Sequence, residues 1–167
     1  MLPPLPDGYE ARMPRCEEAR DLRSVGRDSS DREARLAPAA AEAWLAMHWA
    51  AAQDGLVLVL VSAFRSIAHQ RELLESKLAS GLPWDEILSV AAYPGFSEHH
   101  TGRALDLGVP DSADLTEGFE STPQFAWLSR NAVRFGFALS YPRGNPFGIV
   151  YEPWHWCFSP TAPCQST

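Results

Sequence analysis

The sequence contains little cysteine and no cluster of basic residues. Its three cysteines, Cys16, Cys157 and Cys164, form no C-x-x-C pair, so they supply no structural zinc knuckle and no strong sign of an oxidising compartment. A disulfide between two of them stays open. Lys and Arg number 14 against 21 Asp and Glu, which gives a net charge of -7 at pH 7. Because nucleic-acid binding depends on basic patches that meet phosphates, this charge argues against a nucleic acid as a partner.

The sequence also lacks long apolar runs. No segment approaches the roughly 18 apolar residues of a membrane-spanning helix. The segment from Met1 to Asp7 has neither the basic start nor the apolar run of a signal peptide. As written, the chain is therefore expected in the cytoplasm, whereas removal of a leader would place it in the periplasm or cell envelope.

The composition is that of one ordinary globular domain. With 167 residues and 46% hydrophobic side chains, the chain has enough apolar material for a single core. We expect a monomer with an N-terminal arm over residues 1–34, the folded domain over 35–160 and a tail over 161–167. The arm mixes prolines with charged and small polar residues, which predicts an irregular segment or an extended wrap around the body.

Helical and strand-like patterns alternate through the rest of the chain. Strong helix formers and helical spacing of apolar residues predict helices over residues 35–53, 67–78, 84–91 and 123–135. Short β-rich runs predict strands over residues 56–61, 103–109, 137–141 and 148–151. Because the later strands are joined too closely for helical crossovers, we expect an α+β domain with a central, mainly antiparallel sheet flanked by helices. A solvated acidic loop is expected at Asp111, Asp114 and Glu117.

One short segment combines metal-binding side chains with small residues. Ser97, His99, Gly102, Ala104 and Asp106 follow the pattern S-x-H-x-x-G-x-A-x-D. An imidazole and a carboxylate stand seven positions apart in this pattern, and the residues between them keep the bulk small. A His nitrogen and an Asp oxygen suit Zn²⁺ in a tetrahedral shell, so the segment predicts two zinc ligands.

A second segment supplies the third candidate ligand, His155, with Glu152 three residues before it. A zinc ion with three protein ligands leaves its fourth position for water, and a nearby carboxylate can accept a proton from that water. Glu152 is the candidate for this base. Arg65, at the end of the predicted strand 56–61, is the candidate cation for the negative charge that develops on a carbonyl oxygen under attack. The alternative for Arg65 is a helix cap or an ion pair with Glu72.

Three segments together resemble a known enzyme family. Residues 62–66 with Gln70, residues 97–106 and residues 152–156 are similar to the zinc D,D- and L,D-carboxypeptidases of the peptidoglycan peptidase family, the LAS-type metallopeptidases. This family also contains the vancomycin-resistance D-Ala-D-Ala dipeptidases. The resemblance covers about residues 36–158 and implies a small α+β fold of the Hedgehog/DD-peptidase type.

The resemblance also implies roles for individual residues. It makes His99, Asp106 and His155 the zinc ligands, Glu152 the catalytic base and Arg65 the residue that stabilises the reacting carbonyl. Three further residues are expected to face the substrate: Ser97, Gln70 and Trp154. For Trp154 the alternative is a place among the aromatic side chains of the core. His100 stands where the family more often has Gln, and two roles stay open for it: contact with the substrate, or a place in the loop without such contact.

The function implied by the resemblance is removal of a terminal D-alanine from peptidoglycan stem peptides or muropeptides by a zinc-dependent carboxypeptidase. Two alternatives stay open. One is an endopeptidase or a D-Ala-D-Ala dipeptidase that uses the same site, and the other is a zinc-containing binding module without catalysis. The choice between D,D and L,D bonds depends on the pocket shape, which loops such as residues 110–122 and 142–147 are expected to set.

Overall fold

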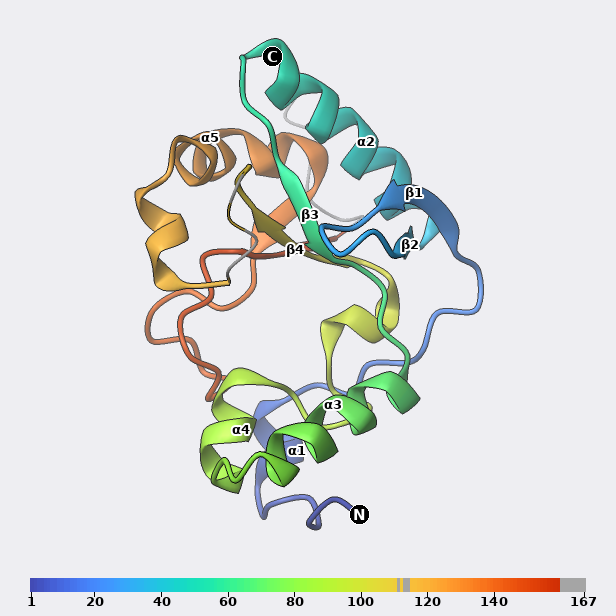
Figure 1. Ribbon diagram of the computed structural model, residues 1–167, viewed down its shortest axis with the longest axis vertical. Helices are drawn as coiled ribbons and strands as arrows, with labels where there is room; N and C mark the ends of the chain where they lie inside the picture. Colours follow the sequence, from blue (N-terminus) through green and yellow to red (C-terminus); the bar gives the residue numbers. More distant parts are fainter. Residues whose placement is uncertain (111, 113–114, 160–167) are drawn as a thin grey trace.

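A central antiparallel sheet organises the fold (Figure 1). The computed structural model describes residues 1–110, 112 and 115–159. The sheet has the strand order β3-β4-β6-β5, and every neighbouring pair is antiparallel. Its strands are β3 (Val59–Ser62), β4 (Ala104–Gly108), β5 (Phe137–Leu139) and β6 (His155–Phe158). The predicted α+β domain with a central antiparallel sheet is thereby confirmed.

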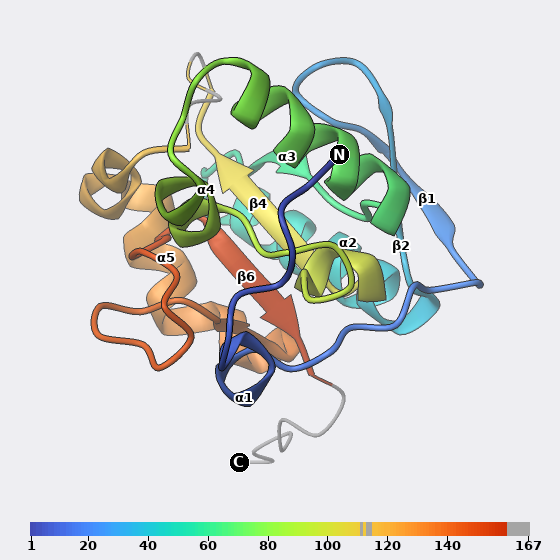
Figure 2. The same cartoon turned by 90° about the horizontal axis from the view of Figure 1, so that it is seen from below.

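Helices lie on both sides of this sheet. In Figures 1 and 2, α2 (Pro38–Gln53) and α5 (Pro123–Asn131) lie on one side of the sheet. On the other side lie α1 (Tyr9–Arg12), α3 (Ile67–Ala79) and α4 (Trp84–Val90). Short 3-10 helices complete the fold: η1 (Glu98–Thr101), η2 (Glu117–Ser121) and η3 (Ala132–Phe135). The sheet therefore forms a layer between two groups of helices.

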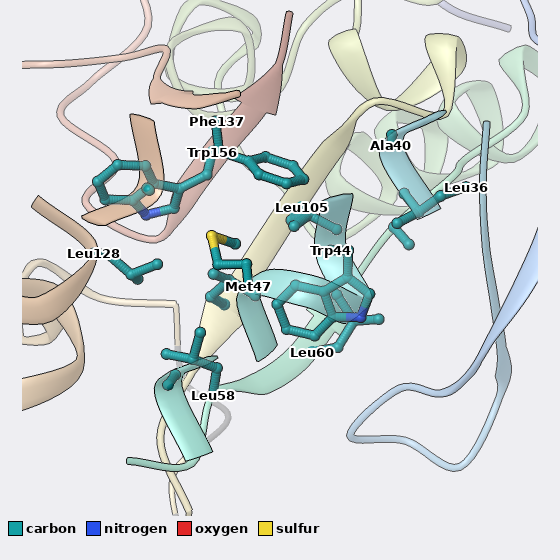
Figure 3. Close-up of a cluster of buried hydrophobic side chains, with 14 of the residues drawn as sticks. Leu36, Ala40, Trp44, Met47, Leu58, Leu60, Leu105, Leu128, Phe137 and Trp156 are labelled. Carbon is teal, nitrogen blue, oxygen red and sulfur yellow. The ribbon is translucent and has the colours of Figure 1, made fainter. Parts of the chain in front are cut away.

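The larger apolar core fills the space between the sheet and helices α2 and α5 (Figure 3). Side chains alternate along a strand, so Leu105 and Leu107 of β4 share one face, and both are completely buried in this core. Trp44 and Met47, one turn apart on α2, pack into the same cluster. Asp106 lies between the two leucines in sequence and therefore points to the opposite face of the sheet.

A second apolar core lies among the N-terminal segment, α3 and α4. It contains Tyr9 from α1, Leu74 from α3, Ile87 from α4 and Tyr141 from the loop that follows β5. The ring of Tyr9 meets that of Phe96 edge to face, with the centroids 5.3 Å apart. These contacts attach the first residues of the chain to the helices that face the polar side of the sheet.

The N-terminal 34 residues do wrap around the body, as one of the two readings expected. The backbone N–H of Cys16 donates to the carbonyl of Gly95, and that of Ala19 donates to His100, both at 2.8 Å. The prediction of an irregular segment is nevertheless wrong for part of the arm, because β1 (Arg23–Arg27) pairs with β2 (Glu33–Leu36). The second of these strands also crosses the predicted end of the arm at residue 34. Most residues of β1 are exposed and polar, so no apolar alternation marks it as a strand.

The predicted strand over residues 148–151 is wrong. Gly148 has a φ of 73°, which interrupts an extended backbone, and the N–H of Val150 donates to the carbonyl of Ser89 in α4 rather than to a strand. The last strand is instead β6, which begins at His155, within the segment 152–156 that contains the candidate base and the third candidate ligand. The four residues of β6 are too few to show a clear periodicity.

Other boundaries moved by a few residues. Helix α2 begins at Pro38 instead of residue 35 because residues 33–36 form β2, and β3 begins at Val59 instead of Leu56. The helix predicted over residues 123–135 is α-helical only to Asn131 and continues as η3. The helices predicted at 67–78 and 84–91 are confirmed as α3 and α4.

Some sequence features lie outside the described residues: Asp111, Asp114, Cys164 and the tail 161–167. Of the predicted acidic loop, Glu117 is described, and it pairs with Arg143 at 3.0 Å. Cys16 and Cys157 are free thiols. None of the helices that the structure describes is long and apolar enough to cross a membrane.

Candidate active site

Three strands of the central sheet place polar residues next to one another. Asp106 of β4 lies opposite His155 of β6, and Ser62 of β3 lies opposite Asp106 on the other side. A bulge between Leu60 and Ser62 sets the second pairing, because an uninterrupted ladder would have put Val61 opposite Asp106. The bulge therefore re-aims the end of β3 toward the polar face of the sheet.

The 3-10 helix η1 and the glycine after it deliver the other candidate ligand. Gly102 ends η1 with a φ of 65°, a left-handed conformation that glycine adopts without strain. A Cβ at this position would lie 2.8 Å from the backbone nitrogen of Ala37, so the close approach also requires glycine. The Nδ1 of His99 donates to the carbonyl of Ala63 at 2.6 Å, and its Nε2 faces Oδ2 of Asp106 at 3.1 Å.

Two imidazoles and one carboxylate converge at this place. The ligand atoms of His99, Asp106 and His155 lie within 4.8 Å of one another, and all three side chains are buried. Burial alone would raise the pKa of Asp106, but the two neighbouring imidazoles hold it well below its usual value. This donor set is one that zinc accepts while a fourth position stays open, so the residues fit the metal.

The two ring nitrogens of His155 face different carboxylates. Nδ1 lies 3.0 Å from Oδ1 of Asp106, and Nε2 lies 2.9 Å from Oε2 of Glu98. Burial alone would lower the pKa of His155, but the hydrogen bonds to both carboxylates outweigh it and raise the pKa to about 10. In the metal-free protein this ring therefore carries a proton on each nitrogen at neutral pH.

Zinc binding is expected to release about one proton per metal ion near pH 8.5, because a ligating imidazole must be unprotonated. The proton comes from His155, since the pKa of His99 is lowered by burial and Asp106 is already ionised. Zinc affinity then rises roughly tenfold per pH unit between pH 7 and 9. Calorimetric titrations in two buffers of different ionisation enthalpy measure the released protons, and a titration without proton release contradicts the assignment of His155.

Glu152 lies beside these candidate ligands. Its Oε2 is 3.9 Å from Nδ1 of His155, and its backbone N–H donates to the carbonyl of Tyr141 at 3.1 Å. Burial raises the pKa of Glu152 to about 7 even though the charge on His155 opposes this shift. A carboxylate with a pKa near neutrality suits a group that takes up a proton and releases it again.

The guanidinium of Arg65 reaches the same centre from the segment after β3. It donates from Nη2 to Oγ of Ser62 at 3.0 Å and from Nη1 to Oε1 of Gln70 at 2.8 Å. Nη2 also lies 3.9 Å from Oδ2 of Asp106. Within the described part of the chain, the carboxylate that pairs with Arg65 is thus Asp106 and not Glu72.

A cleft of about 370 Å³ opens over these groups. Gln70 lies in its wall and is fixed there, because its Nε2 donates to the carbonyl of Ala92 at 2.7 Å. Trp154 lines the cleft and also packs against the larger core, so both readings of this residue apply. The lining includes every site residue that the sequence predicted: Arg65, Gln70, Ser97, His99, Asp106, Glu152, Trp154 and His155.

Two neighbours of the site were not predicted from the sequence. The ring of Tyr141 lies 4.8 Å from that of His155 and lines the cleft. Glu98 pairs with the same histidine from the opposite side. A carboxylate directly before a candidate histidine ligand is a signal that could have identified Glu98, whereas no local pattern marks Tyr141.

His100 has a structural role. Its side chain is completely buried, its Nδ1 donates to the carbonyl of Arg65 at 2.6 Å, and its Nε2 accepts from the N–H of Gly95 at 3.1 Å. It is not part of the cleft lining. The ring therefore joins η1 to the segment that carries Arg65, and the substrate contact that was one reading of this residue is not supported.

Comparisons with known proteins agree with this geometry. The chain is 37% identical over 121 residues to YodJ of Bacillus subtilis (strain 168), named provisionally as a carboxypeptidase. The match includes 70% of this chain and 43% of YodJ. The LdcB LD-carboxypeptidase structure, solved for its peptidoglycan recognition, matches with a TM-score of 0.75 and 30% identity over 84% of this chain and 69% of that one. A point mutant of a vancomycin-resistance D,D-pentapeptidase VanY, solved in complex with Zn(II), shares the fold, with a TM-score of 0.65 and 24% identity over 87% of this chain and 80% of that one.

The chain thus spans less than half the length of the first curated relatives that it matches, 43% and 42%. The match to the family pattern is nevertheless broad, because it extends over residues 33–161 and includes every residue of the cleft. The chain belongs to the VanY family, described as D-alanyl-D-alanine carboxypeptidase.

Proposed function

We propose that this chain is a zinc-dependent carboxypeptidase that removes a terminal D-alanine from peptidoglycan stem peptides. The observation that carries the proposal is the convergence of three ligand atoms within 4.8 Å, with Glu152 and Arg65 in the same cleft. All these groups come from one chain, which supports action as a monomer. The family description and the peptidoglycan recognition of LdcB support the substrate class.

His99, Asp106 and His155 would hold the zinc ion. When bound, zinc supplies a Lewis acid that polarises a carbonyl and makes water a stronger nucleophile at neutral pH. Glu152 accepts a proton from the attacking water, which its pKa of about 7 in the metal-free site allows. The same carboxyl then donates that proton to the nitrogen of the leaving D-alanine.

Arg65 acts on the other side of the reacting carbonyl. Ser62 and Gln70 hold its guanidinium from two directions, so the cation is oriented before the substrate arrives. It donates a hydrogen bond to the carbonyl oxygen as negative charge develops there, and such preorganised donors lower the barrier without rearrangement. Ser97 and Trp154 form the walls against which the terminal residue lies.

A side-by-side assay of synthetic stem peptides tests the proposal. Zinc-loaded protein is incubated with four substrates: a pentapeptide that ends in D-Ala-D-Ala, a tetrapeptide that ends in one D-Ala, free D-Ala-D-Ala dipeptide and a cross-linked muropeptide. The products are identified by mass spectrometry. Loss of one alanine from the pentapeptide or the tetrapeptide is the expected result. The first substrate reports D,D-carboxypeptidase activity and the second L,D-carboxypeptidase activity.

The remaining outcomes decide against the proposal. Turnover of the free dipeptide alone would make the chain a dipeptidase. Cleavage of cross-linked muropeptides without release of alanine would make it an endopeptidase. Zinc binding with no hydrolysis of any of these substrates would make it a binding module.

A further inference from the structure

Glu98 is a half-buried acidic residue that the proposed reaction does not use. It is the first residue of η1, its side chain is only 28% exposed, and it does not line the cleft. Its Oε2 lies 2.9 Å from Nε2 of His155. The carboxylate of Glu98 therefore lies on the side of the His155 ring that faces away from Asp106.

The two candidate histidine ligands present different nitrogens to the centre. His99 is oriented by a backbone acceptor, because its Nδ1 donates to the carbonyl of Ala63 and its Nε2 faces Asp106. His155 is oriented the opposite way, with Nδ1 facing Asp106 and Nε2 bound to Glu98. For His155 the group that fixes the ring is thus a side chain, which a substitution can remove.

Glu98 is itself held in place. The hydroxyl of Ser140 hydrogen-bonds to its carboxylate, and the hydroxyl of Thr101 donates to its backbone carbonyl at 2.7 Å. Burial alone would raise the pKa of Glu98, but the hydrogen bond with His155 lowers it, so the group is a carboxylate. Two adjacent residues of η1 therefore serve the same site: His99 is a candidate ligand, and Glu98 contacts the ring of the other candidate ligand, His155.

We infer that Glu98 is a positioning residue that fixes the ring of His155 with Nδ1 toward the zinc site. This inference rests on the zinc site of the proposed function. A carboxylate on the outer nitrogen of a ligating imidazole fixes the tautomer and orientation of the ring and increases the basicity of the nitrogen that binds metal. Without it, the ring of His155 loses the hydrogen bond that fixes it from the side away from Asp106, and its outer nitrogen is left without its charged partner.

Zinc affinity of the metal-free protein tests this role without any substrate. The dissociation constant is measured by competition with a chromophoric chelator for the wild-type chain, Glu98→Ala and Glu98→Gln. Glu98→Ala is expected to bind zinc about 10- to 100-fold more weakly, the range found when such outer partners are removed. Glu98→Gln keeps an oxygen that accepts from Nε2, so its loss is expected to be smaller.

The matched control is Glu86→Ala, which removes an exposed carboxylate from α4. It is expected to bind zinc as the wild-type chain does. Thermal unfolding of each metal-free variant shows whether the fold is kept, and Glu98→Gln carries the test if Glu98→Ala does not fold. At saturating zinc, Glu98→Ala is expected to have the KM of the wild-type chain but a lower kcat.

The two proposals fail in different ways. If the wild-type chain binds zinc and hydrolyses stem peptides while a folded Glu98→Ala binds zinc equally well, only the positioning role is overturned. The role is also overturned if Glu86→Ala loses as much affinity as Glu98→Ala, because the effect then follows net charge. A wild-type chain that binds no zinc overturns the proposed function together with this inference.

Discussion

Replacement of Glu152 by glutamine is expected to lower kcat for stem-peptide hydrolysis by about 100- to 10,000-fold while zinc stays bound. Glutamine has nearly the shape of glutamate but cannot accept a proton from water. Glu152 lies 3.9 Å from His155 but is not one of the three converging ligand groups, so the metal site itself is left unchanged. Metal analysis of the purified variant together with the peptide assay measures both effects.

The variant Glu152→Ala, which removes the carboxyl group altogether, is expected to retain zinc and to abolish hydrolysis. Glu86→Gln serves as control, because it neutralises an exposed carboxylate outside the cleft and is expected to keep full activity. Retained turnover in a zinc-loaded Glu152→Gln would mean that another group accepts the proton, and Glu152 would lose its assigned role.

The position of Glu152 shows what a sequence can and cannot reveal about such a site. The residue types at 152 and 155 pointed to a base and a ligand, but the segment around them was expected to follow a strand at 148–151 that does not exist. Glu152 is held instead by a backbone bond to Tyr141 within a loop. Side-chain chemistry is local and readable, whereas the path of a loop depends on which distant backbone groups it meets.

Asp106 and His155 illustrate the same limit at the level of pairing. Each was recognised separately from its motif, and their direct opposition across β4 and β6 follows from a register that no local pattern specifies. The bulge in β3 that brings Ser62 opposite Asp106 is likewise a property of two strands and not of one. The contact of Glu98 with His155 could not be predicted for a related reason, because the two residues lie 57 positions apart in the sequence.

Where the signal was strong, prediction from sequence succeeded. The apolar run before Ser62 predicted β3, at one edge of the sheet, and the alternation around Leu105 predicted its neighbour β4, where burial on one face imposes a period of two. The exposed β1 carries no such constraint and was missed. The predicted site residues converged because the motifs reported chemistry that the fold assembles in one cleft.

Replacement of Arg65 by lysine is expected to lower kcat by about 100- to 1,000-fold with little change in KM and full retention of zinc. The planar guanidinium donates to Ser62 and Gln70 at the same time and still lies 3.9 Å from Asp106. An ammonium group carries the same charge, but it lacks the rigid fork that makes these bonds together, so it is not held in place for the developing oxyanion.

Arg35→Lys is the matched control for this substitution. Arg35 is exposed, and its guanidinium lies 5.9 Å from the ring centroid of Phe64, next to Arg65 in sequence. Its replacement is expected to leave kcat and KM unchanged. A loss that acts mainly on kcat places the contribution of Arg65 in the transition state, whereas a raised KM at constant kcat would show that Arg65 binds the ground-state substrate instead. That second pattern would contradict the assigned role, because a group that stabilises both states equally does not accelerate the chemical step.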